Sequence, residues 1–404
     1  MSVKFRLGAM MFLQYAIWGS WSPVLSDYLL NRLGFSGPQV GFIYSLLPLA
    51  TIISPFIGGQ VADRYFPTQR VIAILQLLGG GLLIFGSRLN DFSSLATLML
   101  IYCLIYAPTL ALTNSIAFIN LRDSEKEFGQ IRVWGTIGWI VAGLLLAGWR
   151  LLFKSFGLAA VSGDTLLLAG IFSLIMGLTS FRLPHTPPKK EATNPWAFLE
   201  AIRLLKEKNL AIFIIIAFVV ATELMFYYVM TAPYLTSAMI GVSASAVSGV
   251  MVIAQIAEIF VMAFLLPYFL PRFGIRTTLL IGILAWPLRY IIFVIGRPAW
   301  LVIASLSLHG FCYVFFFTAA FIYIDRVAPS DIRASAQSLI TLATIGLGNY
   351  LGSLFAGWIQ ALFTGPAGTN WRGVFAVPAV LTILCALIFF LFFRTEKNKE
   401  ESGG

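Results

Sequence analysis

VIAQIAEIFVMAF, residues 252–264, is an apolar stretch with a single carboxylate, Glu258, at its centre. A second stretch, VVATELMFYY at residues 219–228, carries Glu223 in the same way. With their flanks, both runs can cross a bilayer, which takes about 20 residues of helix. An ionisable group at that depth is costly unless it faces a polar cavity or a partner. The two acids are therefore the first candidates for a functional site within a membrane.

The composition of the whole chain is that of a polytopic membrane protein. Of its 404 residues, 59% are hydrophobic and only 11% are charged, whereas soluble domains carry about 25% charged residues. The net charge of +10 therefore does not indicate nucleic-acid binding. Cys103, Cys312 and Cys385 all lie in apolar runs, with the spacing of neither disulfides nor metal ligands. We expect no metal and no cofactor.

Twelve apolar segments are long enough to span a bilayer, so the predicted fold is an all-α integral membrane protein with twelve transmembrane helices. The predicted spans are 5–29, 38–62, 71–89, 93–120, 130–149, 164–182, 210–237, 244–270, 277–296, 299–324, 335–363 and 371–393.

The longest polar connection, 183–209, divides these spans into six and six. Its second half, residues 195–208, has apolar residues at helical spacing, which indicates an amphipathic helix on the membrane surface. The predicted domains are an N-terminal six-helix bundle (1–182), this linker, a C-terminal six-helix bundle (210–393) and a tail (394–404). Parallel halves of this kind are typical of alternating access about a central site.

The distribution of lysine and arginine predicts the orientation. These residues concentrate on the side that holds both termini, and the connection 183–209 alone contributes Lys189, Lys190, Arg203, Lys206 and Lys208. Basic residues favour the cytoplasmic side of a membrane. We therefore expect a multi-pass protein of the bacterial inner membrane with both termini in the cytoplasm.

The loop GGQVADRYFPTQR, residues 58–70, resembles the signature loop of the major facilitator superfamily. Gly59, Asp63, Arg64 and Arg70 fill the expected places, and Asp63 and Arg64 are candidate gating charges; ordinary loop charge is the alternative. Four further segments together resemble the bacterial nucleoside:proton symporters, a branch of that superfamily. These segments are FLQYAIWGSW (12–21), YAPTLALTNSIAF (106–118), IRVWGTIGW (131–139) and IRASAQ (332–337).

The resemblance implies nucleoside import with protons through a cavity between the halves. It implies cavity roles for Arg132 and Thr136 in the fifth span and for Gln255 and Glu258 in the eighth.

The sequence departs from the family pattern in two spans. In the seventh span, Met225 and Tyr228 stand where the family has glutamine and asparagine. In the tenth, Tyr313 and Val314 match an aromatic–aspartate pair, and His309 replaces a tyrosine. The walls formed by these two spans are therefore where the substrate preference of this chain is expected to differ.

Four ionisable groups are predicted to share one depth. At about 1.5 Å per helical residue, Glu223, Glu258, Arg289 and His309 each lie roughly 20 Å from the charged ends of their spans. Glu258 is the leading candidate for proton coupling; a permanent Glu258–Arg289 bridge is the alternative. Arg289 is expected to be the structural partner of one of the acids. His309 is either a second coupling group or a hydrogen-bonded packing residue.

Other polar and aromatic side chains complete the candidate site. Trp18 either stacks on a planar ligand or fills the core. Arg132 either faces the cavity or closes a cytoplasmic gate. Tyr227 lies one turn beyond Glu223 and can offer its hydroxyl. The predicted substrate-binding residues are Gln14, Trp18, Asn114, Arg132, Thr136, Glu223, Tyr227, Tyr228, Gln255, Glu258, His309 and Tyr313. The predicted structural or gating charges are Asp63, Arg64, Arg289 and Arg333.

The predicted function is proton-coupled import of nucleosides or a related small polar solute by alternating access. A transporter for another substrate (a sugar, a modified nucleoside or an exported apolar compound) is the alternative. A membrane enzyme or sensor is disfavoured, because the two histidines are far apart and neither H-E-x-x-H nor G-x-S-x-G occurs. The expected partners are the solute, protons and the bilayer, and we expect a monomer that binds no nucleic acid.

Overall fold

The computed structural model describes residues 2–158, 162–187, 196, 199, 201–330 and 332–394, with backbone alone at 55–65 and 124–126. The described chain is almost entirely helical, and its one sheet is a two-stranded hairpin. An all-helical architecture satisfies every backbone hydrogen bond within the segment, as a bilayer requires. The predicted all-α fold is confirmed.

The first part of the chain forms seven helices. These are α1 (Val3–Trp21), α2 (Leu25–Asn31), α3 (Gly37–Tyr65), α4 (Thr68–Gly86), α5 (Phe92–Asn120), α6 (Ser124–Ser155) and α7 (Asp164–Ser180). Local capping sets some of the starts. Before α5, for example, the Ser94 amide donates to the Asp91 carboxylate, and this hydrogen bond lowers the pKa of Asp91.

The second part follows a 3₁₀ helix, η1 (Ile202–Lys206), and contains several π-helical turns, labelled η2 to η4. Its elements are α9 (Lys208–Thr236), α10 (Val247–Phe260), η2 (Val261–Leu265), α11 (Leu266–Ile295), α12 (Ala299–Ser305), α13 (Leu308–Gly310), η3 (Phe311–Thr318), α14 (Ala319–Val327), α15 (Arg333–Thr341), η4 (Leu342–Gly348), α16 (Asn349–Leu362), β1 (Thr364–Gly365), β2 (Gly368–Thr369) and α17 (Trp371–Phe392).

Helices occupy all twelve predicted spans, with two differences in detail. The first span is two helices, α1 and α2, separated at residues 22–24. The eighth and ninth spans run on as one helical segment that breaks at Gly274, whose φ of 74° suits glycine. By length and composition, nine helical segments within the described residues qualify as membrane-spanning, the segment Val247–Ile295 counting as one. The number of crossings therefore stays a prediction.

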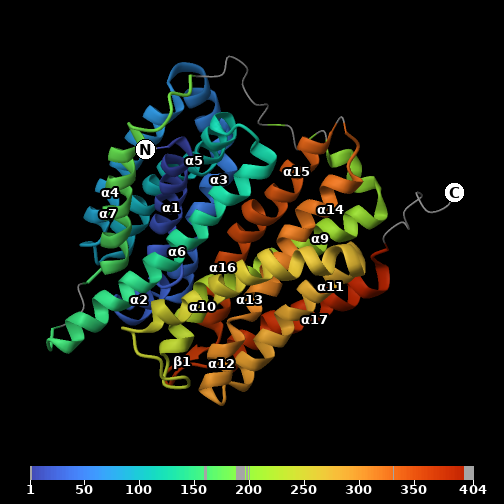
Figure 1. Ribbon diagram of the computed structural model, residues 1–404. Coiled ribbons are helices and arrows are strands. Elements are labelled where there is room, and N and C mark those ends of the chain that lie inside the picture. Colours follow the sequence, from blue (N-terminus) through green and yellow to red (C-terminus); the bar gives the residue numbers. More distant parts are fainter. Residues whose placement is uncertain are drawn as a thin grey trace.

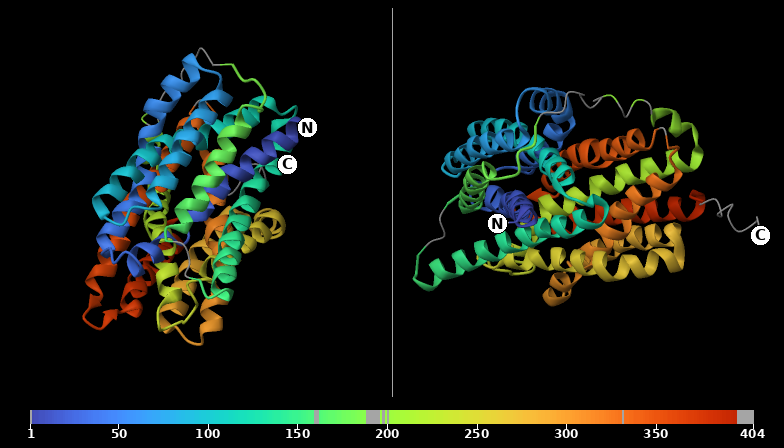
Figure 2. Two further views of the ribbon diagram at one scale, coloured as in Figure 1. Left: turned by 90° about the vertical axis from the view of Figure 1, so that its left-hand side faces the viewer. Right: turned by 45° about the horizontal axis from the view of Figure 1, so that its top comes forward.

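Helices α1–α7 gather on one side of the molecule and α9–α17 on the other (Figure 1). We call these two groups the N-terminal and C-terminal halves. They meet chiefly where α3 packs on α16 and where α6 packs on α10, and Figure 2 shows α6 running beside α10. Both seams need small residues: a Cβ on Gly357 would lie 2.3 Å from the Gly37 carbonyl oxygen, and one on Gly143 would lie 2.7 Å from Val252.

The two ends of the helices differ in how the halves are joined. We call the end where α1 begins and α17 finishes the terminal face, and the opposite end the distal face. The Gly37–Gly357 contact lies at the distal face, as does the hydrogen bond from Arg150 in α6 to the Ala244 carbonyl. At the terminal face the described polar contacts stay within one half, as in Lys4–Glu127 and Arg333–Asp325. The described halves are thus joined at the distal face.

The connection between the halves begins as a segment that is hydrogen-bonded to the N-terminal half. The Thr186 amide donates to the Gln69 side chain, and Asn120 donates to the Thr186 hydroxyl. Of the predicted surface helix at 195–208, the structure describes residues 196, 199 and 201–208, which include η1. Residues 195, 197, 198 and 200 lie outside the described residues, so the surface helix stays a prediction. The side chains of Asp63 and Arg64 also lie outside them, so their gating role stays a prediction.

Replacing Gly357 by alanine should destabilise the protein, because its new Cβ would collide with backbone atoms of Gly37 and Gly41 in the opposite half. Overpacking of this kind costs about 1–3 kcal/mol. Thermal unfolding in detergent micelles measures the loss. Gly148→Ala is the matched control, since its Cβ meets nothing within 4 Å. Equal unfolding temperatures for the two variants would show that the seam is not tightly packed.

Candidate functional site

A cavity of about 460 Å³ lies between the two halves and is lined by both. This volume falls in the range of small-molecule sites, roughly 300–1,000 Å³. Helices α1, α3, α5 and α6 line it from one side, and α9, α10, η3 and η4 from the other. Eight of the twelve predicted substrate-binding residues line it, namely Trp18, Asn114, Arg132, Thr136, Tyr228, Gln255, Glu258 and Tyr313.

The cavity holds one charge of each sign among its described lining residues, Glu258 and Arg132. Glu258 lies on α10 in the C-terminal half, and Arg132 lies on α6 in the N-terminal half. The Arg132 guanidinium is 4.0 Å from the centre of the Tyr15 ring, and the Glu258 carboxylate lines the same cavity from the other half. No hydrogen bond to another described residue holds the Glu258 carboxylate, so it is open to a proton or a ligand.

Three amide side chains add hydrogen-bonding capacity. The side-chain oxygens of Asn114, Gln255 and Asn349 are buried and have no partner in the structure. A buried polar atom left unpaired costs free energy, so these atoms are suited to a ligand or to water. All three residues line the cavity. The amide groups therefore provide places to hydrogen-bond a polar solute from both halves.

An aromatic wall crosses from one half to the other. Trp18 and Trp139 lie 5.4 Å apart between ring centres, and Trp139 lies 6.2 Å from Tyr228 of the C-terminal half. Flat π faces of this kind can pack against a planar ring. Sequence reasoning did not single out Trp139. Its spacing from Arg132 and Thr136, seven and three residues, places all three on one helix face and could have identified it.

Gln14 does not line the cavity, which corrects the prediction. It is completely buried in a polar network that joins α1, α4, α5 and α7. Its amide donates to Thr109 at 2.9 Å, and its oxygen accepts from Gln76 at 3.0 Å. Ser173 donates to the Gln76 side chain at 2.7 Å. Buried polar groups need such partners, so Gln14 holds the N-terminal half together.

Glu223, Tyr227 and His309 also lie behind the cavity wall and are fully buried. On α9, Leu224, Met225 and Tyr228 face the cavity, so Glu223 and Tyr227 fall on the opposite face. The Glu223 carboxylate accepts from Thr222, while its second oxygen has no partner. In this conformation the three side chains are turned away from the cavity, and their predicted substrate contacts stay predictions.

Arg289 does not pair with either acid, contrary to the prediction. Its guanidinium donates to Nδ1 of His309 at 3.2 Å and lies 4.6 Å from the rings of both Tyr227 and Trp286. The described ion pairs include none between Arg289 and Glu223 or Glu258. Aromatic faces and an imidazole thus surround this buried cation in place of a carboxylate.

The same geometry disfavours His309 as a proton carrier. Because a guanidinium only donates, Nδ1 of His309 must accept, and the neutral ring carries its hydrogen on Nε2. A second proton on Nδ1 would break the hydrogen bond and place two positive charges in contact. This geometry favours the packing alternative for His309 beside Arg289, and its coupling role stays a prediction. Glu258 is the acid that lines the cavity among the described residues.

Two further predicted positions lie away from the cavity wall. Val314, the counterpart of the family's aspartate, is buried in an apolar cluster with Val261, Leu266 and Phe315. Arg333 lies 3.7 Å from Asp325, with both side chains about half exposed, so their ion pair contributes little stability. Within the described residues, no group of three metal-ligating side chains exists.

Comparison with known proteins gives a consistent result. A family described as "Nucleoside H+ symporter" matches residues 1–398. The putative nucleoside transporter YegT of Escherichia coli is 37% identical over 99% of this chain and 96% of its own length. Xanthosine permease of the same organism is 32% identical over 99% of this chain and 98% of its length.

A solved structure agrees with these relatives. The crystal structure of nucleoside transporter NupG superposes with a TM-score of 0.85 at 29% identity, covering 98% of this chain and all of that one.

Replacing Gln76 by leucine should lower the free energy of unfolding by about 1–3 kcal/mol, because partners of Gln76 in the buried network lose a hydrogen bond. Thermal unfolding in detergent checks this. Gln130→Leu on α6 is the control, since Gln130 is exposed. Unfolding of Gln76→Leu at the same temperature as the control would show that the network does not hold the four helices together.

Proposed function

The chain belongs to the nucleoside H+ symporter family, whose members are transporters and not enzymes, and we propose that its central cavity carries a nucleoside together with a proton by alternating access. One observation supports this above the others: the cavity places a free carboxylate, an arginine and an aromatic wall between two halves of a major facilitator fold. A site shared by both halves can be exposed to one side of the membrane at a time.

A nucleoside fits the chemistry of the cavity walls. Its planar base can pack in the aromatic wall formed by Trp18, Trp139 and Tyr228. Its ribose hydroxyls and base edge can bond to the unpaired amides of Asn114, Gln255 and Asn349. The relatives named xanthosine permease and nucleoside permease support this substrate class.

Glu258 carries the coupled proton in this proposal. When ionised, it is attracted by Arg132 across the cavity; when protonated, it loses that attraction. The proton thus changes the electrostatic interaction between the two halves at the level of the substrate. Because Val314 occupies the position of the family's aspartate, Glu258 is the one carboxylate among the described cavity-lining residues.

The proposal includes an orientation and a division of the chain. The protein is a multi-pass membrane protein. The concentration of lysine and arginine supports a cytoplasmic terminal face. The family and its bacterial relatives support an inner-membrane location and import. The two bundles, 1–182 and 210–393, then move about the linker 183–209, with the chain acting as a monomer.

A second substrate class is favoured by two lining residues. Met225 and Tyr228 make the α9 wall less able to hydrogen-bond than the amide pair the family resemblance implies. A modified nucleoside with an added apolar group would suit this wall better than an unmodified one. A sugar would not use the aromatic wall as fully, and an exported apolar compound would leave the amides unpaired.

Uptake by proteoliposomes tests the substrate class. Labelled uridine and adenosine should accumulate when a pH gradient, acidic outside, is imposed, and accumulation should stop when a protonophore collapses the gradient. Excess unlabelled nucleoside should compete, whereas maltose should not. If no nucleoside is taken up and none raises the unfolding temperature of the purified protein, the nucleoside assignment is wrong.

Replacing Glu258 by glutamine should abolish gradient-driven accumulation and leave nucleoside exchange measurable, because the amide keeps the shape but cannot exchange a proton. His309→Gln is the matched control: its side-chain oxygen can still accept from Arg289, and it should keep accumulation. Both rates are measured in the same proteoliposomes. Full accumulation by Glu258→Gln, or its loss in His309→Gln alone, would reverse the assignment of the two residues.

A further inference from the structure

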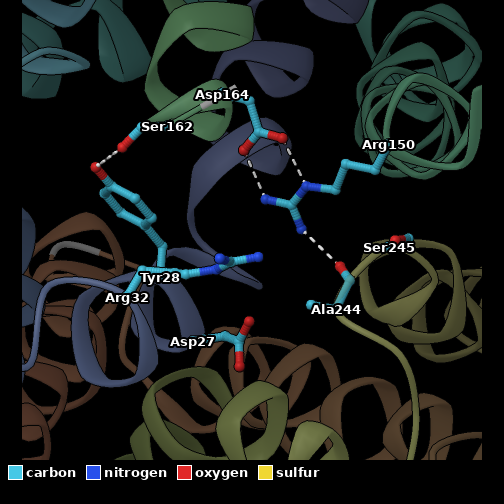
Figure 3. Close-up of a pocket in the computed structure, with 8 residues that line it drawn as sticks. All are labelled: Asp27, Tyr28, Arg32, Arg150, Ser162, Asp164, Ala244 and Ser245. Atoms are coloured by element: carbon cyan, nitrogen blue, oxygen red, sulfur yellow. Dashed lines mark hydrogen bonds and ion pairs between the residues drawn. The ribbon is translucent and has the colours of Figure 1, made fainter. Parts of the chain in front are cut away.

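A second, smaller cavity of about 110 Å³ lies at the distal face between the halves. It is lined by charged side chains of the N-terminal half, among them Asp27, Arg150 and Asp164, and by Ala244 and Ser245 of the C-terminal half. Figure 3 shows the Arg150 guanidinium between the Asp164 carboxylate and the Ala244 carbonyl. None of these residues belongs to the substrate cavity.

Arg150 and Asp164 form a bidentate ion pair within the N-terminal half. Nε of Arg150 donates to one carboxylate oxygen at 2.7 Å, and Nη2 donates to the other at 2.6 Å. Both side chains are at least nine-tenths buried. This fork-on-fork geometry fixes the plane of the guanidinium. The remaining nitrogen, Nη1, then points across the seam and donates to the Ala244 carbonyl at 3.1 Å.

Asp27 makes the second polar connection between the halves at this face. Its carboxylate accepts from Asn31 of the same half at 2.7 Å and from the Thr236 hydroxyl at the end of α9. Asp27 is 6% exposed. The carboxylate therefore holds the end of the first helix of the C-terminal half against α2.

We propose that these two connections, Arg150 to the Ala244 carbonyl and Thr236 to Asp27, form a distal latch that holds the outer side of the transporter closed. In this latch Asp164 is a positioning residue, because it aims the Arg150 side chain across the seam. The inference rests on the alternating access proposed above and adds the residues that control one of its gates.

In the latch, the strong ion pair lies within one half, and only the weaker hydrogen bonds across the seam break when the distal face opens. The ion pair stays inside one half, so opening the distal face does not separate its two charges, and breaking a buried ion pair is strongly unfavourable. Among the described residues, three hydrogen bonds cross the seam, because Asn31 also donates to the Thr236 hydroxyl at 3.3 Å. Each hydrogen bond contributes about 1 kcal/mol, so the latch can hold the closed state and still release it within a transport cycle.

The packing beside the latch is consistent with this role. The close contacts of Gly37 and Gly41 with Gly357, and of Gly143 with Val252, also lie toward the distal face. They bring the helices together without side chains that would interlock. Apolar packing gives contact area but little directional preference, so the hydrogen bonds across the seam fix how the two halves align when the distal face closes.

A cysteine reporter in the substrate cavity tests the latch. Thr51 lines the cavity, and the three native cysteines are buried. A membrane-impermeant thiol reagent is applied to Thr51→Cys in right-side-out and inside-out vesicles, without nucleoside or pH gradient. Thr236→Val should raise the labelling rate from the distal side about fivefold, the shift produced by losing a hydrogen bond of about 1 kcal/mol. Thr236→Ser keeps the hydroxyl and should label at the original rate.

Two further variants complete the design. The double variant Arg150→Gln with Asp164→Asn leaves no unpaired buried charge and should also raise distal labelling. Ser162→Ala is the matched control, because Ser162 bonds Tyr28 at 2.9 Å beside the same cavity but within one half. If Thr236→Val and the double variant label no faster than Ser162→Ala, the latch is refuted. Because no substrate is present, this result is separate from a failure of the nucleoside assignment.

Discussion

The attraction between Glu258 and Arg132 across the central cavity is the interaction on which the proposed mechanism depends. A carboxylate within a membrane is costly unless it faces a polar cavity or a partner, and the one cation among the described cavity-lining residues, Arg132, lies on the other half of the molecule. A charge pair within one half would stabilise that half equally in every relative position of the two halves. A pair between halves ties the protonation of one side chain to their relative position. The site can therefore couple a proton to a movement.

The other buried charges are arranged so that they do not compete with this pair. Arg289 is surrounded by His309, Tyr227 and Trp286. Arg150 is neutralised by Asp164 within the N-terminal half. Glu223 is turned away from the cavity. Arg289 and Glu223 contact polar partners of their own half, whereas Arg150 also donates to the Ala244 carbonyl of the other half. No described ion pair crosses the distal seam.

The distal and central interactions fit one cycle. The glycine seams and the proposed latch join the halves at the distal face, while described polar contacts at the terminal face remain within a half. In the proposed cycle, protonation of Glu258 removes its attraction to Arg132 in the central cavity. The latch then determines how readily the distal side opens. Weak contacts at the gate are an advantage, since a strong one would trap the protein in a single conformation.

Much of the fold was predictable from the sequence, because the bilayer imposes rules that act locally. Apolar length sets where helices lie, and all twelve predicted ranges are helical. Helical spacing also placed Gln255 and Glu258 on one cavity-facing side. It could not rank buried polar residues of equal depth: Glu223 and Glu258 look alike along the chain, yet α9 turns one away and α10 turns the other inward.

The sequence by itself thus determined the membrane class and the helices, since hydropathy and helical periodicity depend on neighbouring residues alone. The tertiary structure decided which partner each charge has. In the folded protein, Arg289 is hydrogen-bonded to His309, Gln14 to Gln76 and Arg150 to the Ala244 carbonyl. These choices depend on how each helix is rotated against helices far away in the chain, and a buried charge takes the partner that this rotation brings within reach.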